Sequence, residues 1–211
     1  MPDAKPTVLI IDDDVQLRNS LERLLRSMGL DAQLFASVSD FLQSDLPDGP
    51  ACLVLDVRLP GQSGLDFQRE LAAANRELPI IFITGHGDIP MSVQAMKGGA
   101  IEFLTKPFRD QDLLDAIRLG LSRDRARREN ERALANCRER FNSLSPRERE
   151  IMIQVARGRL SKQIAGDIGI TESTVKVHRS NAMRKMRVRT LPELGRLAEK
   201  LKLVPEKPQH S

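Results

Sequence analysis

Acidic, hydroxyl and cationic side chains in the first half of the chain have the types and spacing that phosphoryl chemistry requires. Asp12 and Asp13 follow one short apolar run, Asp56 follows another, and Thr84 and Lys106 follow two more. Carboxylates held close together repel one another at low dielectric unless a hard cation lies among them. Oxygen ligands with open coordination suit Mg²⁺, and a nearby carboxylate can attack a phosphoryl group to form an acyl phosphate. Lys106 could neutralise the developing charge, and the Thr84 hydroxyl could donate to a phosphoryl oxygen.

Each of these residues, taken alone, has a plainer interpretation. An Asp after a strand is often only a helix N-cap. Thr84 alone would be a turn residue, and Lys106 alone would be a solvated surface charge. The joint pattern, in which all of them follow strands of one sheet, favours the phosphoryl site.

The predicted elements bring these side chains to one edge of a sheet. Short apolar runs rich in branched residues indicate buried strands at residues 7–11, 32–35, 51–55, 79–84 and 101–105. Helical spacing follows each strand, at residues 15–28, 38–46, 64–75, 90–97 and 110–121. This alternation predicts a flavodoxin-like α/β fold over residues 1–121, with a doubly wound five-stranded parallel sheet. Such sheets bind ligands at the carboxyl ends of their strands.

The second half of the chain has no strand pattern. Residues 122–143 are dominated by Arg and Glu with sparse apolar positions, which predicts an exposed, charged helical linker, either separate from the preceding helix or continuing it. Ser145 as N-cap, Pro at the next position and Glu148 form a strong helix start with a capping box. Further helices are expected at residues 161–167, 171–186 and 192–203, with a turn at Gly169 and a tail at 205–211. Residues 144–211 are therefore predicted to be a small all-α domain of four helices containing a helix-turn-helix unit.

Charge separates the two halves. Residues 1–120 carry 11 Lys and Arg against 18 Asp and Glu, and the remaining residues carry 22 against 11. This asymmetry indicates an acidic domain that handles a cation or phosphate and a basic domain that faces a polyanion. The two cysteines are far apart, and no segment approaches the roughly 18 uninterrupted apolar residues of a membrane span. We therefore expect a cytoplasmic protein with no membrane partner and no disulfide framework.

Residues 7–121 resemble the receiver domain of two-component response regulators. The resemblance is carried by residues 10–14, 53–61, 83–90 and 103–108, which read IIDDD, LVLDVRLPG, ITGHGDIP and FLTKPF. It implies that Asp56 is the phosphoacceptor. It also implies that Asp12 and Asp13 bind Mg²⁺ together with Asp56 and the backbone carbonyl of Arg58.

The same resemblance implies three further features. Thr84 and Lys106 fall on the positions that contact the phosphoryl group. Phe103 falls on the rotameric switch position, where the tyrosine common in relatives is absent; an aromatic residue on a strand is otherwise usually plain core, so both interpretations of Phe103 stay open. The peptide bond between Lys106 and Pro107 is expected to be cis.

The third helix of the basic half carries a candidate nucleic-acid surface. Val175, Ala182, Met183 and Met186 share helical spacing and are expected to face the core. The opposite face carries cations and small groups suited to phosphates, guanines and thymine methyls. The candidate DNA-contacting residues are Lys176, Val177, His178, Arg179, Ser180 and Arg184, with Lys162 on the preceding helix. A lone basic helix is more often a solvated face, and the preceding helix and turn are what favour DNA binding.

Residues 144–204 resemble the LuxR/NarL/FixJ-type DNA-binding domain. The resemblance is carried by LSPRERE at residues 144–150 and TVKVH at residues 174–178. It implies that Lys176 and Val177 reach base edges. The position of Ser180 is often basic or an amide in that family, and His178 could contact phosphate, a base or nothing, so these two roles stay open.

The two resemblances together predict a phosphorylation-dependent, DNA-binding transcription regulator of the FixJ/NarL type. A sensor histidine kinase would transfer a phosphoryl group to Asp56, and phosphorylation would promote homodimerisation and promoter binding. RNA polymerase is an open further partner. The chain is expected to be a self-phosphorylating phosphoacceptor rather than an enzyme, and its unphosphorylated first domain is expected to hinder the second through the linker. The alternative is phosphorylation-independent DNA binding, with the first domain serving as a dimer scaffold.

A rival interpretation is a phosphohydrolase of the haloacid-dehalogenase type. Asp12, Asp13 and the two residues after them also fit the nucleophile motif of those enzymes. Such enzymes need another acidic cluster at the end of a further strand after the lysine, and no such strand pattern follows Lys106. The rival also leaves Asp56 and the basic half unexplained.

Overall fold

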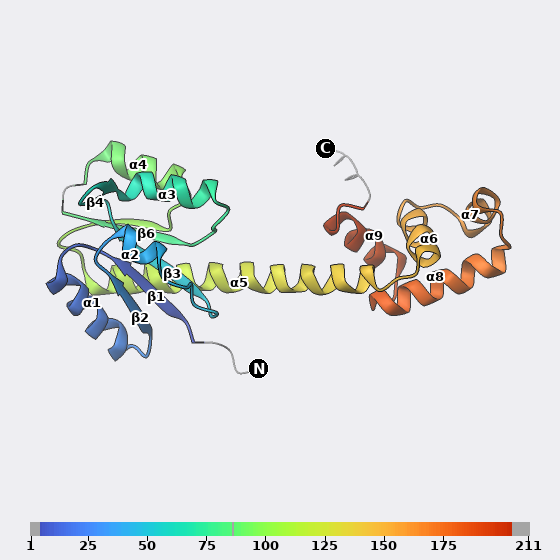
Figure 1. The fold of residues 1–211 in the computed structure, drawn as a ribbon, viewed down its shortest axis with the longest axis horizontal. Coiled ribbons are helices and arrows are strands. Elements are labelled where there is room, and N and C mark those ends of the chain that lie inside the picture. Colours follow the sequence, from blue (N-terminus) through green and yellow to red (C-terminus); the bar gives the residue numbers. More distant parts are fainter. Residues whose placement is uncertain (1–4, 86, 204–211) are drawn as a thin grey trace. The chain divides into compact units, whose positions relative to one another are not determined.

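Five parallel strands form the predicted sheet, in the order β2-β1-β3-β6-β7. The strands of this computed structural model are β1 (Thr7–Ile11), β2 (Asp31–Phe35), β3 (Ala51–Asp56), β6 (Ile80–Thr84) and β7 (Glu102–Thr105). The structure describes residues 5–85 and 87–203, so the predicted tail at 205–211 lies outside the described residues. The chain divides into two units, Met1–Arg128 and Glu129–Ser211 (Figure 1).

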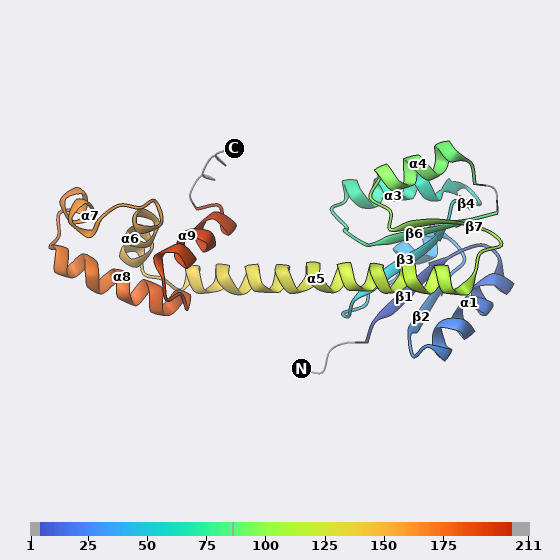
Figure 2. The same ribbon diagram turned by 180° about the vertical axis from the view of Figure 1, so that it is seen from behind.

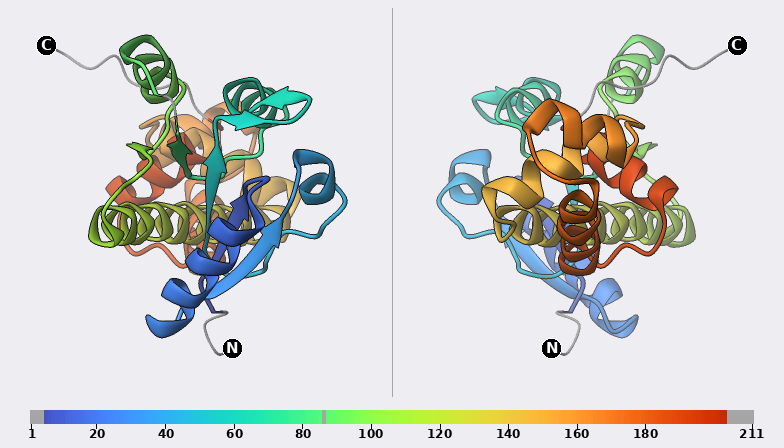
Figure 3. Two further views of the ribbon diagram at one scale, coloured as in Figure 1. Left: turned by 90° about the vertical axis from the view of Figure 1, so that its left-hand side faces the viewer. Right: turned by 90° about the vertical axis from the view of Figure 1, so that its right-hand side faces the viewer.

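Helices cover both faces of the sheet. The helices that begin in the first unit are α1 (Val15–Ser27), α2 (Val38–Leu42), α3 (Gly64–Ala73), α4 (Ile89–Lys97) and α5 (Asp110–Asn142), the last of which extends into the second unit. Side chains alternate along β3, so that Leu53 and Leu55 pack against α2, α3 and α4, whereas Cys52 and Val54 pack against α1 and α5. Figure 2 and the left panel of Figure 3 show this layering. The prediction of a doubly wound parallel α/β fold is confirmed.

Two details of the first unit differ from the predicted elements. α2 ends at Leu42 rather than at residue 46, because the backbone N–H and the hydroxyl of Ser44 both donate to the Phe41 carbonyl and close the helix. A small antiparallel hairpin, β4 (Arg58–Leu59) and β5 (Gln62–Ser63), follows β3. Strands of two residues are too short for side-chain periodicity to reveal.

α5 is one continuous helix of 33 residues, so the charged linker continues the fifth helix of the first unit, a possibility that the sequence left open. Its first part packs on the sheet through Leu113 and Ile117. Its last part packs on the core of the second unit through Leu134 and Phe141. The sequence predicted that the intervening segment would be exposed along its whole length. That part of the prediction is wrong, because Asp124 is completely buried.

Up to residue 203, where the described part of the chain ends, four short helices follow α5, as the sequence predicted. They are α6 (Pro146–Ala156), α7 (Ser161–Ile168), α8 (Glu172–Met186) and α9 (Leu191–Lys200) (Figure 3, right). Gly169 ends α7 with φ +67°, a conformation that glycine adopts without the penalty of a Cβ. Thr171 then caps α8 by accepting a hydrogen bond from the Thr174 backbone N–H at 3.2 Å. The helix-turn-helix prediction is confirmed. Among the described helices, none is both long and apolar enough to cross a bilayer.

Glu148 ties the start of α6 to α8. Its carboxylate accepts hydrogen bonds from Lys185 Nζ at 2.7 Å and from the Ser145 backbone N–H at 2.9 Å, the second of which completes the predicted capping box. The bond from Lys185, followed by the bond from Ser145, lowers the pKa of Glu148 below its ordinary value of 4.5.

We expect Glu148→Gln to lower the free energy of unfolding at pH 7 by about 1–2 kcal/mol, because the amide oxygen can still accept the Ser145 N–H but Lys185 loses its charged partner. Because the folded-state pKa is depressed, the ionised carboxylate stabilises fully above pH 4.5 and this contribution is lost as pH falls through the lower value. Urea unfolding followed by circular dichroism at several pH values measures the difference. Glu150→Gln, an exposed change on the same helix, is the control. A destabilisation that persists undiminished at pH 3 would contradict the electrostatic explanation.

Candidate functional site

Three carboxylates meet at the carboxyl edge of the sheet. β1 ends at Ile11 and pairs with β3 in the register Ile11↔Leu55, so Asp12 and Asp56 come off neighbouring strands side by side. Oxygen atoms of Asp12, Asp13 and Asp56 lie within 4.8 Å of one another. Asp12 is completely buried, Asp56 is 6% exposed and Asp13 faces solvent. One open side on an otherwise buried acidic cluster is suited to an ion that keeps some of its waters.

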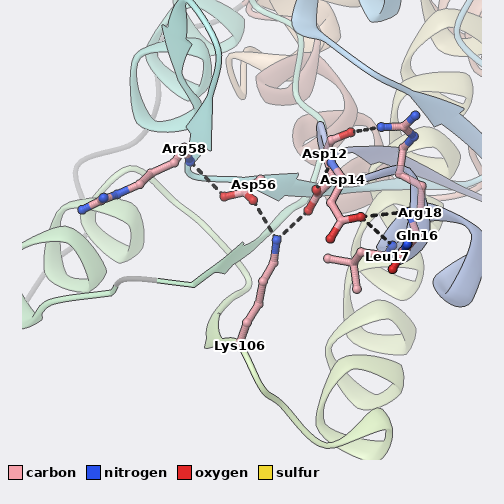
Figure 4. A network of polar contacts seen from close by, with 8 residues as sticks. All are labelled: Asp12, Asp14, Gln16, Leu17, Arg18, Asp56, Arg58 and Lys106. Carbon is pink, nitrogen blue, oxygen red and sulfur yellow. Dashed lines mark hydrogen bonds and ion pairs between the residues drawn. The ribbon is translucent and has the colours of Figure 1, made fainter.

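Lys106 links two of these carboxylates (Figure 4). It follows β7, and its Nζ donates to Asp12 Oδ2 and Asp56 Oδ2, both at 2.7 Å. The second oxygen of each carboxylate is held by the backbone, since Asp12 Oδ1 accepts from the Asp14 N–H and Asp56 Oδ1 from the Arg58 N–H, both at 2.9 Å. The orientations of both carboxylates are therefore set by the chain itself.

The pKa values of Asp12 and Lys106 are both raised in the cluster. Burial raises the pKa of Asp12 and the charge of Asp56 adds to the rise, although Lys106 and the Asp14 N–H oppose it. Burial lowers the pKa of Lys106, but hydrogen bonds to Asp12 and Asp56 outweigh burial and raise it. One cation thus faces two buried acids and an exposed third, a balance that favours binding a further positive charge.

The other predicted residues of this site lie at the same edge. Thr84 ends β6, is completely buried, and its carbonyl accepts a hydrogen bond from the Lys106 backbone N–H at 2.7 Å. Phe103 is half-buried on β7, with its ring centroid 6.3 Å from that of Phe82. The peptide bond between Lys106 and Pro107 is cis, as expected. The side chain of Arg58 points away from the carboxylates (Figure 4). The prediction for this residue concerns its backbone carbonyl alone.

Two residues that the sequence analysis did not single out also shape the site. The Arg18 guanidinium, on α1, donates to the carbonyl oxygen of Asp12 and ties the helix to the acidic turn (Figure 4). Gly64 starts α3 so close to β3 that a Cβ there would lie 2.4 Å from the Asp56 carbonyl oxygen. The only signal in the sequence was that Arg18 faces back along a helix toward its acidic N-terminus, and nothing marked Gly64.

The second unit presents the predicted polar face of α8. Lys176, Val177, Ser180 and Arg184 are exposed, as is Lys162 on α7, whereas His178 and Arg179 are half-buried. Val175, Ala182 and Met186 are buried in the core and Met183 is partly so, as their spacing predicted.

Two contacts restrain cations on this face. Arg179 Nη1 reaches the Ser161 hydroxyl at 3.5 Å. Lys176 pairs with Glu172 at 2.8 Å, and this hydrogen bond lowers the pKa of Glu172. Glu172 therefore competes for Lys176 with any new partner.

Comparisons with known proteins agree with both units. Residues 8–118 match the family described as response regulator receiver domain, and residues 142–198 match bacterial regulatory proteins of the luxR family. Nodulation protein W of Bradyrhizobium diazoefficiens is 55% identical over 197 residues, covering 93% of this chain and 87% of that protein. Response regulator protein TodT of Pseudomonas putida is 46% identical over 202 residues, covering 96% and 89%. The solved structure of the response regulator StyR has 50% identity, covers 93% of this chain and 100% of its own, and superimposes with a TM-score of 0.82.

The chain therefore belongs to the FixJ-like two-component response regulators, in which a receiver domain is joined to a LuxR-type DNA-binding domain. Its function is the regulation of transcription, and its two domains imply a kinase and DNA as partners. The two domains fit a non-enzymatic regulator. The strand that a dehalogenase-type hydrolase would need is absent from the described part of the chain, where β7 is the last strand.

Proposed function

We propose that Asp56 accepts a phosphoryl group from a sensor histidine kinase and that this modification controls binding to promoter DNA. The observation that carries the proposal is the placement of Asp56 beside Asp12 and Asp13, with Lys106 bonded across the cluster. A carboxylate oxygen of Asp56 attacks phosphorus in line, the new O–P bond forms as the P–N bond to the kinase histidine breaks, and the imidazole leaves with the bonding electron pair.

The oxygen donors of the cluster fit Mg²⁺. Asp12, Asp13 and Asp56, with the backbone carbonyl of Arg58, would hold the ion, which when bound neutralises charge on the phosphoryl oxygens. Lys106 holds a second positive charge at the same place, and we assign the Thr84 hydroxyl to a phosphoryl oxygen. Phosphorylation of Asp56 would then draw Thr84 inward and let the Phe103 ring follow it.

The proposed consequence is a homodimer with a higher affinity for DNA. Residues 1–121 would form the receiver, residues 122–143 the helical linker and residues 144–211 the DNA-binding domain. Two DNA-binding domains held together bind paired half-sites through a higher effective concentration. We further propose that the unphosphorylated receiver restrains the second domain, that the protein acts in the cytoplasm, and that RNA polymerase is a partner at promoters.

The proposed DNA contacts are made by the exposed face of α8. The candidate residues are Lys176, Val177, His178, Arg179, Ser180 and Arg184, with Lys162 on α7. Their support is the combination of exposed cations, a methyl-bearing side chain and a half-buried Arg179 held near the start of α7.

We expect Lys176→Ala to cost about 1–3 kcal/mol at a specific site and to relax sequence preference, because this side chain is proposed to read a base edge. Gel shifts on a specific and a scrambled duplex measure both effects. Lys200→Ala, an exposed change on α9, should leave the ratio of the two affinities unchanged. Equal losses on both duplexes would make Lys176 a phosphate contact instead. Affinity that is flat with salt would count against DNA binding altogether.

The test of the whole proposal is treatment with a small-molecule phosphodonor in the presence and absence of Mg²⁺. Intact mass should show one added phosphoryl group only with Mg²⁺, and the modified protein should shift genomic DNA fragments at lower concentration. A phosphoryl group on Asp12 would revive the hydrolase interpretation. Equal oligomer size and equal DNA affinity with and without modification would favour phosphorylation-independent DNA binding.

A further inference from the structure

A cluster of charged side chains pins α5 to the amino end of β3. Asp124 is completely buried, and its Oδ2 accepts hydrogen bonds from the Ala51 backbone N–H at 2.8 Å and from Arg128 Nε at 2.6 Å. Its Oδ1 accepts from Arg127 Nη2 at 2.6 Å. Arg128 continues to the chain before β3, where its two terminal nitrogens donate to the carbonyls of Asp48 and Pro47 at 2.9 and 3.2 Å. We call Asp124, Arg127 and Arg128 the α5 clamp.

Packing alone does not explain the clamp. A buried carboxylate is costly, and a well-packed apolar side chain at the same place is often as stable as a buried ion pair or more so. What the polar contacts add is direction, because Asp124 and Arg128, besides bonding to each other, bond to particular backbone groups of the short segment from Pro47 to Ala51. β3 begins at Ala51, beside the clamp, and ends at the phosphoacceptor Asp56. The strand that carries the modified residue is therefore the strand to which α5 is bonded.

The clamp also extends the supported part of α5. Leu121 is the last apolar side chain of the helix buried on the sheet, and the next apolar side chain packed on a core is Leu134, in the second unit. The clamp carries the attachment forward to Arg128, which leaves only Glu129–Ala133 as a continuously exposed stretch. A helical segment without tertiary contacts frays in water, because isolated helices shorter than about 12–15 residues are only marginally stable.

We propose that the α5 clamp is the positioning device that couples the phosphorylation state of the receiver to the DNA-binding domain. It does so by keeping the helix that leaves the receiver ordered and bonded to β3. Asp124 and Arg128 are positioning residues, since neither touches the phosphoryl site. This inference rests on the proposed phosphorylation of Asp56.

The test compares full-length Asp124→Asn and Arg128→Ala with the matched helix-surface controls Asp115→Asn and Arg125→Ala. Each protein is treated with phosphodonor and Mg²⁺, the fraction phosphorylated is read by intact mass, and DNA affinity is measured before and after. We expect the clamp variants to reach wild-type phosphorylation while the ratio of the two affinities, about 5-fold or more for a typical coupled system, falls toward one. Hydrogen exchange at residues 122–128 should accelerate in the clamp variants and remain unchanged in the controls.

The outcomes separate this inference from the proposed function. Wild-type protein that gains no phosphoryl group, or gains one with no change in DNA affinity, would overturn the proposed function. Wild-type protein that responds while both clamp variants respond equally would overturn the clamp inference alone. Arg128→Ala leaves Asp124 with its Arg127 and Ala51 partners, so it tests coupling even where Asp124→Asn fails to fold.

Discussion

Asp56→Asn should abolish both the added phosphoryl mass and the phosphodonor-dependent rise in DNA affinity. An amide at this position can still accept the Arg58 backbone N–H, and Lys106 keeps its bond to Asp12, so the fold should survive. The amide is a poor nucleophile and cannot form the acyl phosphate. The effect is therefore a loss of chemistry in a folded protein.

Two measurements decide this result. Intact mass after phosphodonor treatment reports the modification, and gel shifts before and after treatment report the consequence. Asp66→Asn changes an exposed acid on α3 and should behave as wild type. An Asp56→Asn protein that still raises its DNA affinity with phosphodonor would disprove the assignment of the acceptor.

Lys106→Ala should slow acyl phosphate formation by roughly 10²–10³-fold, the usual cost of removing one preorganised group that meets developing charge. The Lys106 ammonium lies 2.7 Å from an oxygen of each buried carboxylate, so it occupies the place to which a phosphoryl group on Asp56 would bring new negative charge. Without it, two acids of the cluster also lose their shared cation.

The rate of mass gain at saturating Mg²⁺ measures the effect. Lys97→Ala removes an exposed cation at the end of α4 and is the control for net charge. A Lys106→Ala protein within about 5-fold of the wild-type rate would remove this lysine from the proposed mechanism, since that loss is far below the range for such groups.

Much of the architecture could be predicted because the signals are local. Branched apolar runs identified all five strands of the sheet, and Ser145 with Glu148 marked the start of α6 as a capping box that the structure contains. A capping bond spans three residues and a buried strand is a short run of neighbouring apolar residues, so both can be recognised without knowledge of the rest of the fold. The acidic edge could be predicted for the same reason, since each reactive side chain lies at the end of a strand or directly after it.

The distances between strand ends could not be predicted from local pattern. Asp12, Asp56 and Lys106 are far apart in the chain, and they meet only because β3 pairs with β1 and the sheet continues through β6 to β7. Local pattern shows that these strands exist, and the pairing that makes them neighbours is a property of the whole sheet.

The α5 segment shows the same division most clearly. Its composition reads as a solvated, charged helix, because a run of Arg and Glu is usually exposed. In the folded chain Asp124 is completely buried, since the amino end of β3 leaves an unpaired N–H at Ala51 that a carboxylate on the neighbouring helix can accept. Charge and helical period can be determined from the sequence alone, because they depend only on the residues themselves and their spacing. Which charged residue becomes buried depends on the backbone groups that the fold brings to it.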